Sequence, residues 1–296
     1  MSLKCVKEPV IIAGMHRSGT TMVAGVLKEL GFFIGNDLEA NNESLYFIFT
    51  NAEILRRVNA SWDNPGPVKY FLENKDALDM TVKCLEYDVL SPGIRDYLGW
   101  KNYLKYRSVT EFDMPWGWKD PRNTFTLPLW LRLFPRSKII HMVRNGVDVA
   151  YSLMVREKEE LKRREEIFQR RFNKRSRRSK LEQTGFKGSA RCLTLSGGFS
   201  LWEDYMEQGY EALKKIGNER YEIKYEQFLA DPGKHLKELA GFCGLEGVSG
   251  LLEKAGKNLN RSRANAFRHD PSLLEFYSKV KDTRWMRHCG YSLITG

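Results

Sequence analysis

Short apolar segments alternate along the chain with longer segments in which apolar residues recur at helical spacing. Runs rich in β-branched and other apolar residues predict buried strands within 10–13, 116–123, 137–145 and 220–229. Helical spacing predicts helices at 20–30, 41–58, 73–99, 126–134, 146–154, 199–216 and 233–243. Because strands that alternate with helices form parallel sheets, we expect a three-layer α/β fold, a central parallel sheet with helices on both faces.

The segment after the first predicted strand, GMHRSGTT at 14–21, has the composition of a phosphate-binding loop. Gly14 and Gly19 have the spacing of G-x-x-x-x-G-K-[ST], in which backbone N–H groups and a helix N-terminus approach an anion. Three hydroxyls add further donors, those of Ser18, Thr20 and Thr21. A nucleotide triphosphatase carries lysine where this chain has Thr20, and the cation here is Arg17, inside the loop. The sequence therefore predicts an anion site that differs from that of a triphosphatase.

Together with VRNGVDVAYSL at 143–153, this loop resembles the sulfotransferases that use 3′-phosphoadenosine 5′-phosphosulfate, abbreviated PAPS. In that family the loop after the first strand carries Lys or Arg followed by Ser-Gly-Thr-Thr, and it binds the 5′-phosphosulfate. The resemblance implies that Arg17 stabilises the charge that develops on the departing phosphate. It also implies donor contacts from the residues of the loop, which are His16, Arg17, Ser18, Gly19, Thr20 and Thr21.

The same resemblance implies a second anion site at the end of the third predicted strand. Arg144 ends that strand, and Ser152 lies eight residues on, about two turns into the following helix. In the family an arginine and a serine at this spacing hold the 3′-phosphate of the adenosine. Neither site offers a carboxylate placed to bridge a metal and a phosphate, so we expect no metal. Asp148 is expected to cap or orient the local helix.

Sulfuryl transfer also needs a cation near the transferred group and a base for the acceptor proton. Lys119 in WGWKDPR resembles the family's second cation, and Arg122 is a further candidate for contact with acceptor or donor. Many carbohydrate and tyrosylprotein relatives place a glutamate shortly after the first helix. This resemblance makes Glu39 the first candidate for the base, followed by Asp37 and Glu43.

The resemblance covers nearly the whole chain and implies a single domain, 1–296, with a P-loop NTPase-like fold. The motifs HRSGTT and KDPR resemble the branch that acts on carbohydrates, so the expected acceptor is a hydroxyl of a carbohydrate or glycolipid. A tyrosyl or small-metabolite acceptor stays open. The alternative is a P-loop nucleotide kinase, or a nucleotide-binding protein without sulfuryl transfer. A kinase would need a lysine after Gly19 and a carboxylate for magnesium.

The net charge of +11 favours anionic ligands, and one segment carries most of it. Residues 156–180 hold twelve basic and five acidic residues, whose spacing in the first half supports a solvated helix. We expect 156–190 to be a mobile basic insertion, either an exposed helix with a loop or an arm that recruits an acidic or extended acceptor. Its aromatic residues in 156–180 are Phe168 and Phe172, too few for base stacking, so nucleic acid is not expected as a partner.

Cysteine usage and hydropathy bear on location. The five cysteines are scattered and odd in number, which indicates reduced thiols in a cytoplasmic protein. The sequence has no apolar run of about 20 residues that would predict a membrane span, and its N-terminus lacks the apolar core of a signal peptide. The sequence does not predict the oligomeric state.

Overall fold

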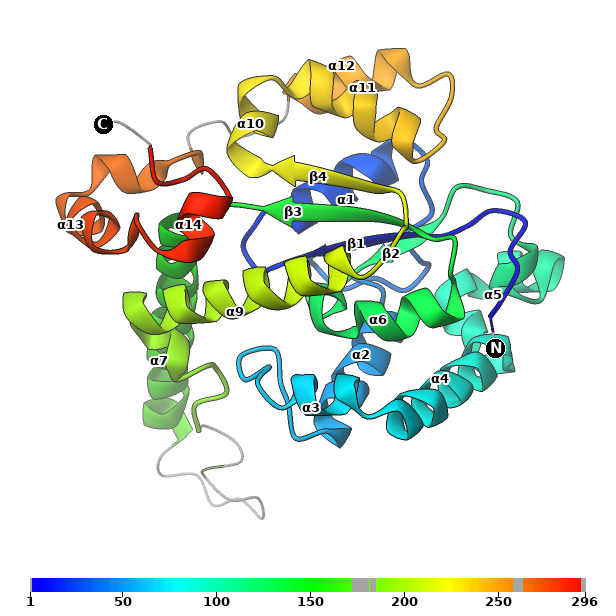
Figure 1. Cartoon of the computed structure of the whole chain (residues 1–296), viewed down its shortest axis with the longest axis horizontal. Coiled ribbons are helices and arrows are strands. Elements are labelled where there is room, and N and C mark those ends of the chain that lie inside the picture. The colour runs from blue at the N-terminus through cyan, green and yellow to red at the C-terminus, as the bar shows by residue number, and fades with distance from the viewer. Residues whose placement is uncertain (1, 172–180, 182–184, 258–262, 294–296) are drawn as a thin grey trace. The chain divides into compact units, whose positions relative to one another are not determined.

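Four parallel strands form the sheet at the centre of one compact unit, Met1–Asn145 with Asp204–Ala266 (Figure 1). They are β1 (Val10–Gly14), β2 (Gly117–Lys119), β3 (Lys138–Val143) and β4 (Arg220–Lys224). Their order is β2-β1-β3-β4, and Val10 of β1 is in register with both Gly117 and Lys138. The computed structural model describes residues 2–171, 181, 185–257 and 263–293. The predicted α/β fold with a central parallel sheet is confirmed.

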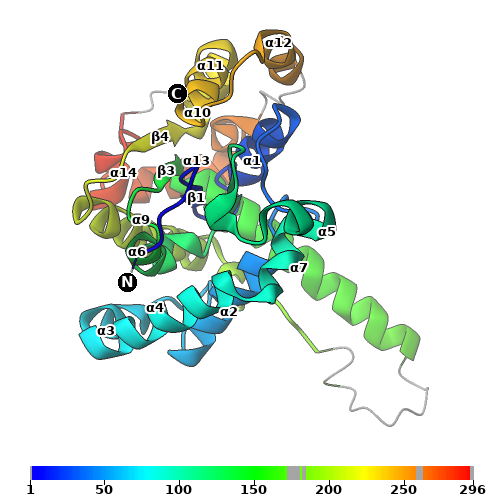
Figure 2. The ribbon, with the colours of Figure 1, turned by 90° about the vertical axis from the view of Figure 1, so that its right-hand side faces the viewer.

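Alternate strand residues point to the two faces of the sheet, and each face is covered by helices. Ile12 and Ile140 pack in one core with α1 (Thr20–Glu29) and α11 (Pro232–Phe242). Ile11 and Ile139 pack in the other core with α2 (Leu45–Arg57), α4 (Lys75–Leu90) and α6 (Asn123–Leu133). Figures 1 and 2 show these helices on opposite sides of the strands. The three layers follow from the period of two in buried strands.

The other helical segments of this unit lie at its edges and connections. They are α3 (Val68–Glu73), the 3₁₀ turns at Pro92–Ile94 and Val109–Glu111, α5 (Arg95–Tyr106), α10 (Tyr225–Ala230) and α12 (Ser249–Lys257). The helix α9 (Leu195–Lys214) is shared, because the division between the two units falls between Glu203 and Asp204.

The single helix expected at 73–99 is wrong, because the chain has capping residues at both breaks. Asn74 caps α4, its side chain accepting from Ala77 N at 2.9 Å. Ser91 is extended and precedes Pro92, which begins a 3₁₀ turn because proline suits a first helical position. The helix expected from 41 begins instead at Leu45, which leaves Glu43 in the preceding loop.

The second unit, Gly146–Glu203 with Phe267–Gly296, is built on one long helix, α7 (Gly146–Arg171). It also contains α13 (Pro271–Val280), α14 (Arg284–His288) and the 3₁₀ turns at Arg191–Leu193 and Ala266–His269, the last of which begins one residue earlier, in the first unit. Asp148 Oδ1 accepts from Phe267 N at 2.9 Å, so this side chain anchors the segment before α13. Its expected role in capping or orienting its own helix stays a prediction. Buried Glu157 on α7 accepts from Ser189 N at 2.9 Å. This hydrogen bond fixes the end of the predicted insertion, 156–190, against α7.

The basic segment is helical as far as Arg171, and Glu160 pairs with Arg163 and Arg164 along it. Residues 172–180 and 182–184, on which the expected mobility mainly falls, lie outside the described residues.

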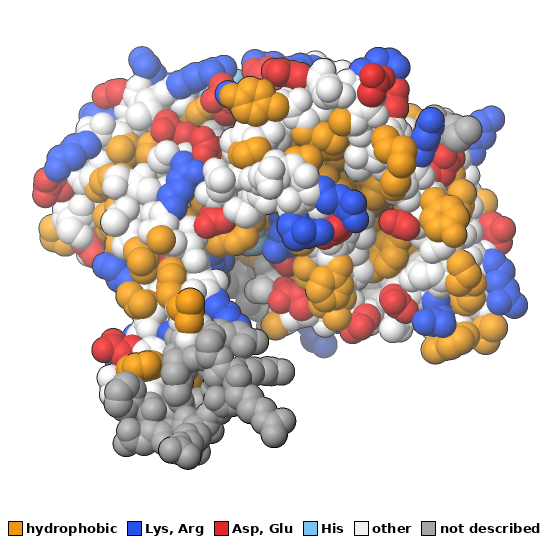
Figure 3. Space-filling model, turned by 90° about the horizontal axis from the view of Figure 1, so that it is seen from below, with side chains coloured by type: hydrophobic (Ala, Val, Ile, Leu, Met, Phe, Trp, Pro, Cys, Tyr) orange, Lys and Arg blue, Asp and Glu red, His pale blue; other side chains and the backbone are white. Residues whose placement is uncertain are grey.

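The prediction of one domain over 1–296 also stays a prediction. Figure 3 shows acidic and basic side chains interspersed over one face. Within the part of the chain described, no helix is long and apolar enough to cross a bilayer, and the five cysteines are free.

Candidate functional site

The loop between β1 and α1 turns so tightly that two of its positions exclude a side chain. Gly14 has φ +139° and Gly19 has φ +100°, both in the region that favours glycine. A Cβ on Gly14 would lie 2.6 Å from the Met142 carbonyl oxygen, and one on Gly19 would lie 2.5 Å from the ring of Tyr225. The two glycines recognised from their spacing are therefore required by the shape of the loop.

The polar groups of this loop have different surroundings. Ser18 is buried, and its Oγ donates to the Met15 carbonyl at 2.6 Å, so this hydroxyl closes the loop on itself. Thr20 is buried in the first turn of α1, and Thr21 follows it. Among the described residues no side chain caps α1 at Gly19. Backbone N–H groups at the start of this helix are thus directed toward the loop without an intrahelical acceptor.

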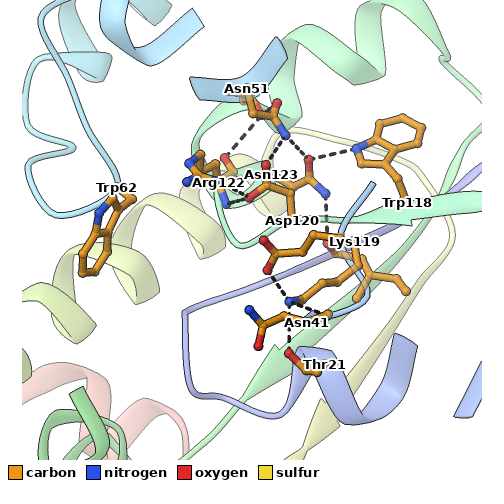
Figure 4. A network of polar contacts seen from close by, with 12 residues as sticks. Thr21, Asn41, Asn51, Trp62, Trp118, Lys119, Asp120, Arg122 and Asn123 are labelled. Atoms are coloured by element: carbon orange, nitrogen blue, oxygen red, sulfur yellow. Dashed lines mark hydrogen bonds and ion pairs between the residues drawn. The ribbon is translucent and has the colours of Figure 1, made fainter. Parts of the chain in front are cut away.

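A lysine from the neighbouring strand reaches the start of α1. Lys119, the last residue of β2, is 2% exposed and forms an ion pair with Glu43 (Figure 4 shows Lys119 with Thr21 and Asn41). Its Nζ also donates to Thr21 Oγ1 at 3.2 Å and to the Asn41 carbonyl at 3.4 Å. The predicted second cation therefore lies beside the loop, although it is 98 residues beyond Thr21 in the chain.

Of the three candidates for the base, Glu43 is the carboxylate that the structure brings to this lysine. Burial raises the pKa of Glu43, although the nearby charge of Lys119 acts in the opposite direction. Glu39 accepts from Asn41 N at 2.8 Å, and Asp37 is exposed. A raised pKa suits a group that must accept a proton near neutral pH. Glu39 stays a prediction from the sequence.

Arg144 follows β3 and lies against the same loop. Its Nη1 donates to the Arg17 carbonyl at 3.0 Å and its Nη2 to the Arg263 carbonyl at 2.8 Å. The guanidinium carbon lies 4.5 Å from the centroid of the Tyr225 ring, which also lies close to Gly19. Arg144, the first residue of the predicted second anion site, therefore lies beside the predicted loop within one unit.

The two histidines near the site differ in surroundings. His16, in the loop, lies edge-on to Trp62 with ring centroids 4.8 Å apart, and Tyr205 donates to the Trp62 carbonyl at 3.0 Å. His141 is buried in β3, with Nδ1 3.4 Å from a carboxylate oxygen of Glu222.

Arg122 and Ser152 are two further candidate residues. Arg122 Nη1 donates to Asp120 at 3.1 Å and keeps 18% of its side chain exposed. Ser152 lies on α7 in the second unit, so its place at the 3′-phosphate stays a prediction.

Within the described residues no group of three His, Cys, Asp or Glu side chains could hold a metal ion, and the metal-free chemistry likewise stays a prediction.

Comparison with known proteins gives a family. The sequence model of the family described as "Sulfotransferase family" matches residues 9–249. The chain is also 24% identical over 255 residues to an uncharacterized protein of Aquifex aeolicus (strain VF5). That match covers 83% of this chain and 27% of the relative, so the chain spans about a quarter of the relative's length.

Solved structures resemble the chain in fold. The "Sulfotransferase Domain from the Curacin Biosynthetic Pathway" is 17% identical, with 95% of this chain and 99% of that chain covered and a TM-score of 0.50. The "Sulfotransferase Domain from the Synechococcus PCC 7002 Olefin Synthase" is 17% identical, with 94% and 89% covered and a TM-score of 0.46. The first similarity agrees with the P-loop-like α/β fold expected from the sequence.

Proposed function

Because the chain belongs to the sulfotransferase family, we propose that it moves a sulfuryl group from PAPS to an acceptor hydroxyl of a carbohydrate or glycolipid. The observation that carries this proposal is the hydrogen bond from Arg144 Nη1 to the Arg17 carbonyl. It joins Arg144, the arginine of the second motif, to the loop of the first motif, and both lie in one compact unit. The kinase alternative is less well supported, because Thr20 holds the position of the P-loop lysine.

The loop fits a bound anionic group. The absence of side chains at Gly14 and Gly19 lets the backbone come close to a ligand, and the start of α1 presents N–H groups with a partial positive charge. Arg17 is exposed in the loop, and Lys119 brings a second cation to Thr21. We assign the 5′ end of the donor to this loop and the 3′-phosphate to Arg144.

The chemistry follows from these charges. When bound, the donor supplies the sulfuryl group and leaves as adenosine 3′,5′-bisphosphate. Arg17 and Lys119 stabilise the negative charge that develops on the leaving phosphate oxygen. A carboxylate takes the proton of the acceptor hydroxyl, and the contact with Lys119 favours Glu43 over Glu39 for this role. The experiment that tests the function is a screen of carbohydrate, glycolipid, tyrosyl-peptide and small-molecule acceptors with ³⁵S-labelled PAPS.

Replacing Arg144 by alanine is expected to weaken the binding of adenosine 3′,5′-bisphosphate by about 10- to 100-fold. The variant loses the proposed charge-assisted contact to the 3′-phosphate, which costs about 1.5–3 kcal/mol. Adenosine 5′-monophosphate, which lacks the 3′-phosphate, should bind the variant and the unchanged protein equally well. Isothermal titration calorimetry measures both, with Arg132→Ala as a surface control. An equal loss for the two nucleotides would contradict the assignment.

The pH profile of turnover is expected to identify the base. Since burial raises the pKa of Glu43, turnover should fall with decreasing pH at values above the ordinary glutamate pKa of about 4.3. The sign follows because a base acts only when ionised. Glu43→Gln should remove this acidic limb and lower kcat by about 10²–10⁴-fold, whereas Glu39→Gln should keep it. If Glu39→Gln removes the limb instead, Glu39 is the base.

A further inference from the structure

The two residues that flank Lys119 in sequence are held by one buried polar cluster. Trp118 Nε1 donates to Asn123 Oδ1 at 3.0 Å. On the other side, Asp120 Oδ2 accepts from Asn51 Nδ2 at 2.9 Å. Figure 4 shows these side chains gathered around Asn51, next to Lys119. The backbone on both sides of the lysine is therefore fixed by side chains rather than by strand pairing alone.

Asn51 is the centre of this cluster and uses its whole hydrogen-bonding capacity. It is fully buried, and Nδ2 donates to Asp120 and to Asn123 Oδ1, each at 2.9 Å. Its Oδ1 accepts from Thr126 Oγ1 at 2.8 Å and from Trp130 Nε1 at 2.9 Å. Because an indole N–H is only a donor, the amide oxygen must face Trp130, and the orientation of Asn51 is fixed.

The helix that carries Asn51 begins just after Glu43. Asn51 lies about two turns into α2, whose first residue is Leu45. Phe47, one turn earlier on the same helix, stacks on Trp118 with centroids 4.0 Å apart and planes 3° from parallel. The helix thus contacts β2 through Phe47 and the residue just after the strand, Asp120, through Asn51. Its start brings Glu43 to Lys119, at the end of that strand.

From these contacts we propose that Asn51 is a positioning residue for sulfuryl transfer. It sets Lys119 opposite Glu43 by tying the residues on either side of the lysine to the helix that follows the glutamate. The inference rests on the proposed function for the role of Lys119 in the reaction. The arrangement of the side chains can be tested independently of that function.

The test compares Asn51→Leu with the matched control Thr50→Val. Leucine has a similar volume but leaves Asp120 and the indole of Trp130 without the amide. Thr50 neighbours Asn51 on α2. Among the contacts described, its Oγ1 donates only within the helix, to the Tyr46 carbonyl at 2.8 Å. Pulse acetylation with acetic anhydride and mass spectrometry measures the access of Lys119. Alkylation of buried Cys243, in the core on the other face of the sheet, reports whether the fold persists.

In Asn51→Leu, acetylation of Lys119 is expected to rise at least about tenfold while Cys243 stays protected, as in a local opening. Hydrolysis of ³⁵S-labelled PAPS, with water as the acceptor, should slow about 10²-fold because catalytic groups are misplaced. The affinity for adenosine 3′,5′-bisphosphate should change by less than about threefold, since Arg144 and the loop glycines are untouched. Thr50→Val should match the unchanged protein in all three measurements.

A second variant, Asn51→Asp, keeps the test decisive if leucine prevents folding. The new carboxyl faces Asp120, and two adjacent carboxylates do not both ionise readily. At each pH, the acetylation of Lys119 is compared with that in the unchanged protein. Lys119 should be exposed to acetylation at high pH. As the pH falls, the new carboxyl gains a proton that it can donate, and Lys119 should be protected again. Asn51→Leu should show no such recovery.

Two results overturn the proposal. One is a folded Asn51→Leu protein in which Lys119 stays as protected, and PAPS hydrolysis as fast, as in Thr50→Val. The other is exposure of Cys243 in both Asn51 variants at every pH, which would make Asn51 a residue of the general fold. If the unchanged protein binds no bisphosphate, the proposed function fails, and the acetylation of Lys119 still tests the position that Asn51 sets.

Discussion

Replacement of Arg17 by alanine is expected to lower kcat about 10²–10³-fold and to change the affinity for adenosine 3′,5′-bisphosphate by less than about threefold. Arg17 is exposed in the loop and has φ 69°, so the chain holds a cation in a strained conformation at this position. In the proposed reaction, its charge is expected to act mainly on the phosphate oxygen that becomes negative as the sulfuryl group departs. Ground-state binding of the nucleotide is expected to depend more on the backbone of the loop and on Arg144.

Single-turnover kinetics with ³⁵S-labelled PAPS measures the rate of sulfuryl transfer, and calorimetry measures the affinity for adenosine 3′,5′-bisphosphate. Arg17→Lys keeps a charge without the planar fork and should retain an intermediate rate. A loss of affinity as large as the loss of turnover would show uniform binding, and the proposed role of Arg17 would then be wrong.

Replacement of Lys119 by methionine is expected to reduce both activity and stability. The variant leaves Glu43 buried without its cation, and such a loss destabilises a fold by about 3–5 kcal/mol. It also removes a charge from the proposed reaction site, which we expect to lower kcat about 10²-fold. Urea unfolding measures the free energy of unfolding, and PAPS hydrolysis measures the rate.

The double variant Lys119→Met with Glu43→Gln separates the two effects. Removing both charges should recover most of the lost free energy of unfolding and none of the rate. Lys75→Met, which breaks an exposed ion pair with Asp79, is the control and should cost less than about 1 kcal/mol. A double variant as unstable as Lys119→Met alone would mean that Lys119 stabilises the fold through contacts other than Glu43.

Much of the fold and of the loop could be predicted because their signals are local. Buried strands are short apolar runs, and the loop depends on Gly14 and Gly19, five residues apart. The helix expected at 73–99 was wrong because Asn74 and Ser91 were not recognised as capping residues. Helical periodicity alone does not show where a chain turns when capping side chains interrupt it.

The pairing of side chains across the site could not be read from the sequence. Lys119 and Glu43 are 76 residues apart, and Glu43 was the third candidate for the base because only its distance from the first helix was known. Asn51 was missed altogether. One signal for it does exist, a polar residue at a core position in the apolar helix LYFIFTNAEIL, where burial demands hydrogen-bonding partners.

The proposed function requires that the loop after β1 and Arg144 together hold the two anionic ends of a single adenosine nucleotide. The most direct measurement is calorimetric titration of the unchanged protein with adenosine 3′,5′-bisphosphate and, separately, with ATP and magnesium. The bisphosphate is expected to bind at least about tenfold more tightly, a difference of about 1.4 kcal/mol or more. Tighter binding of ATP with magnesium, or no binding of the bisphosphate, would contradict it.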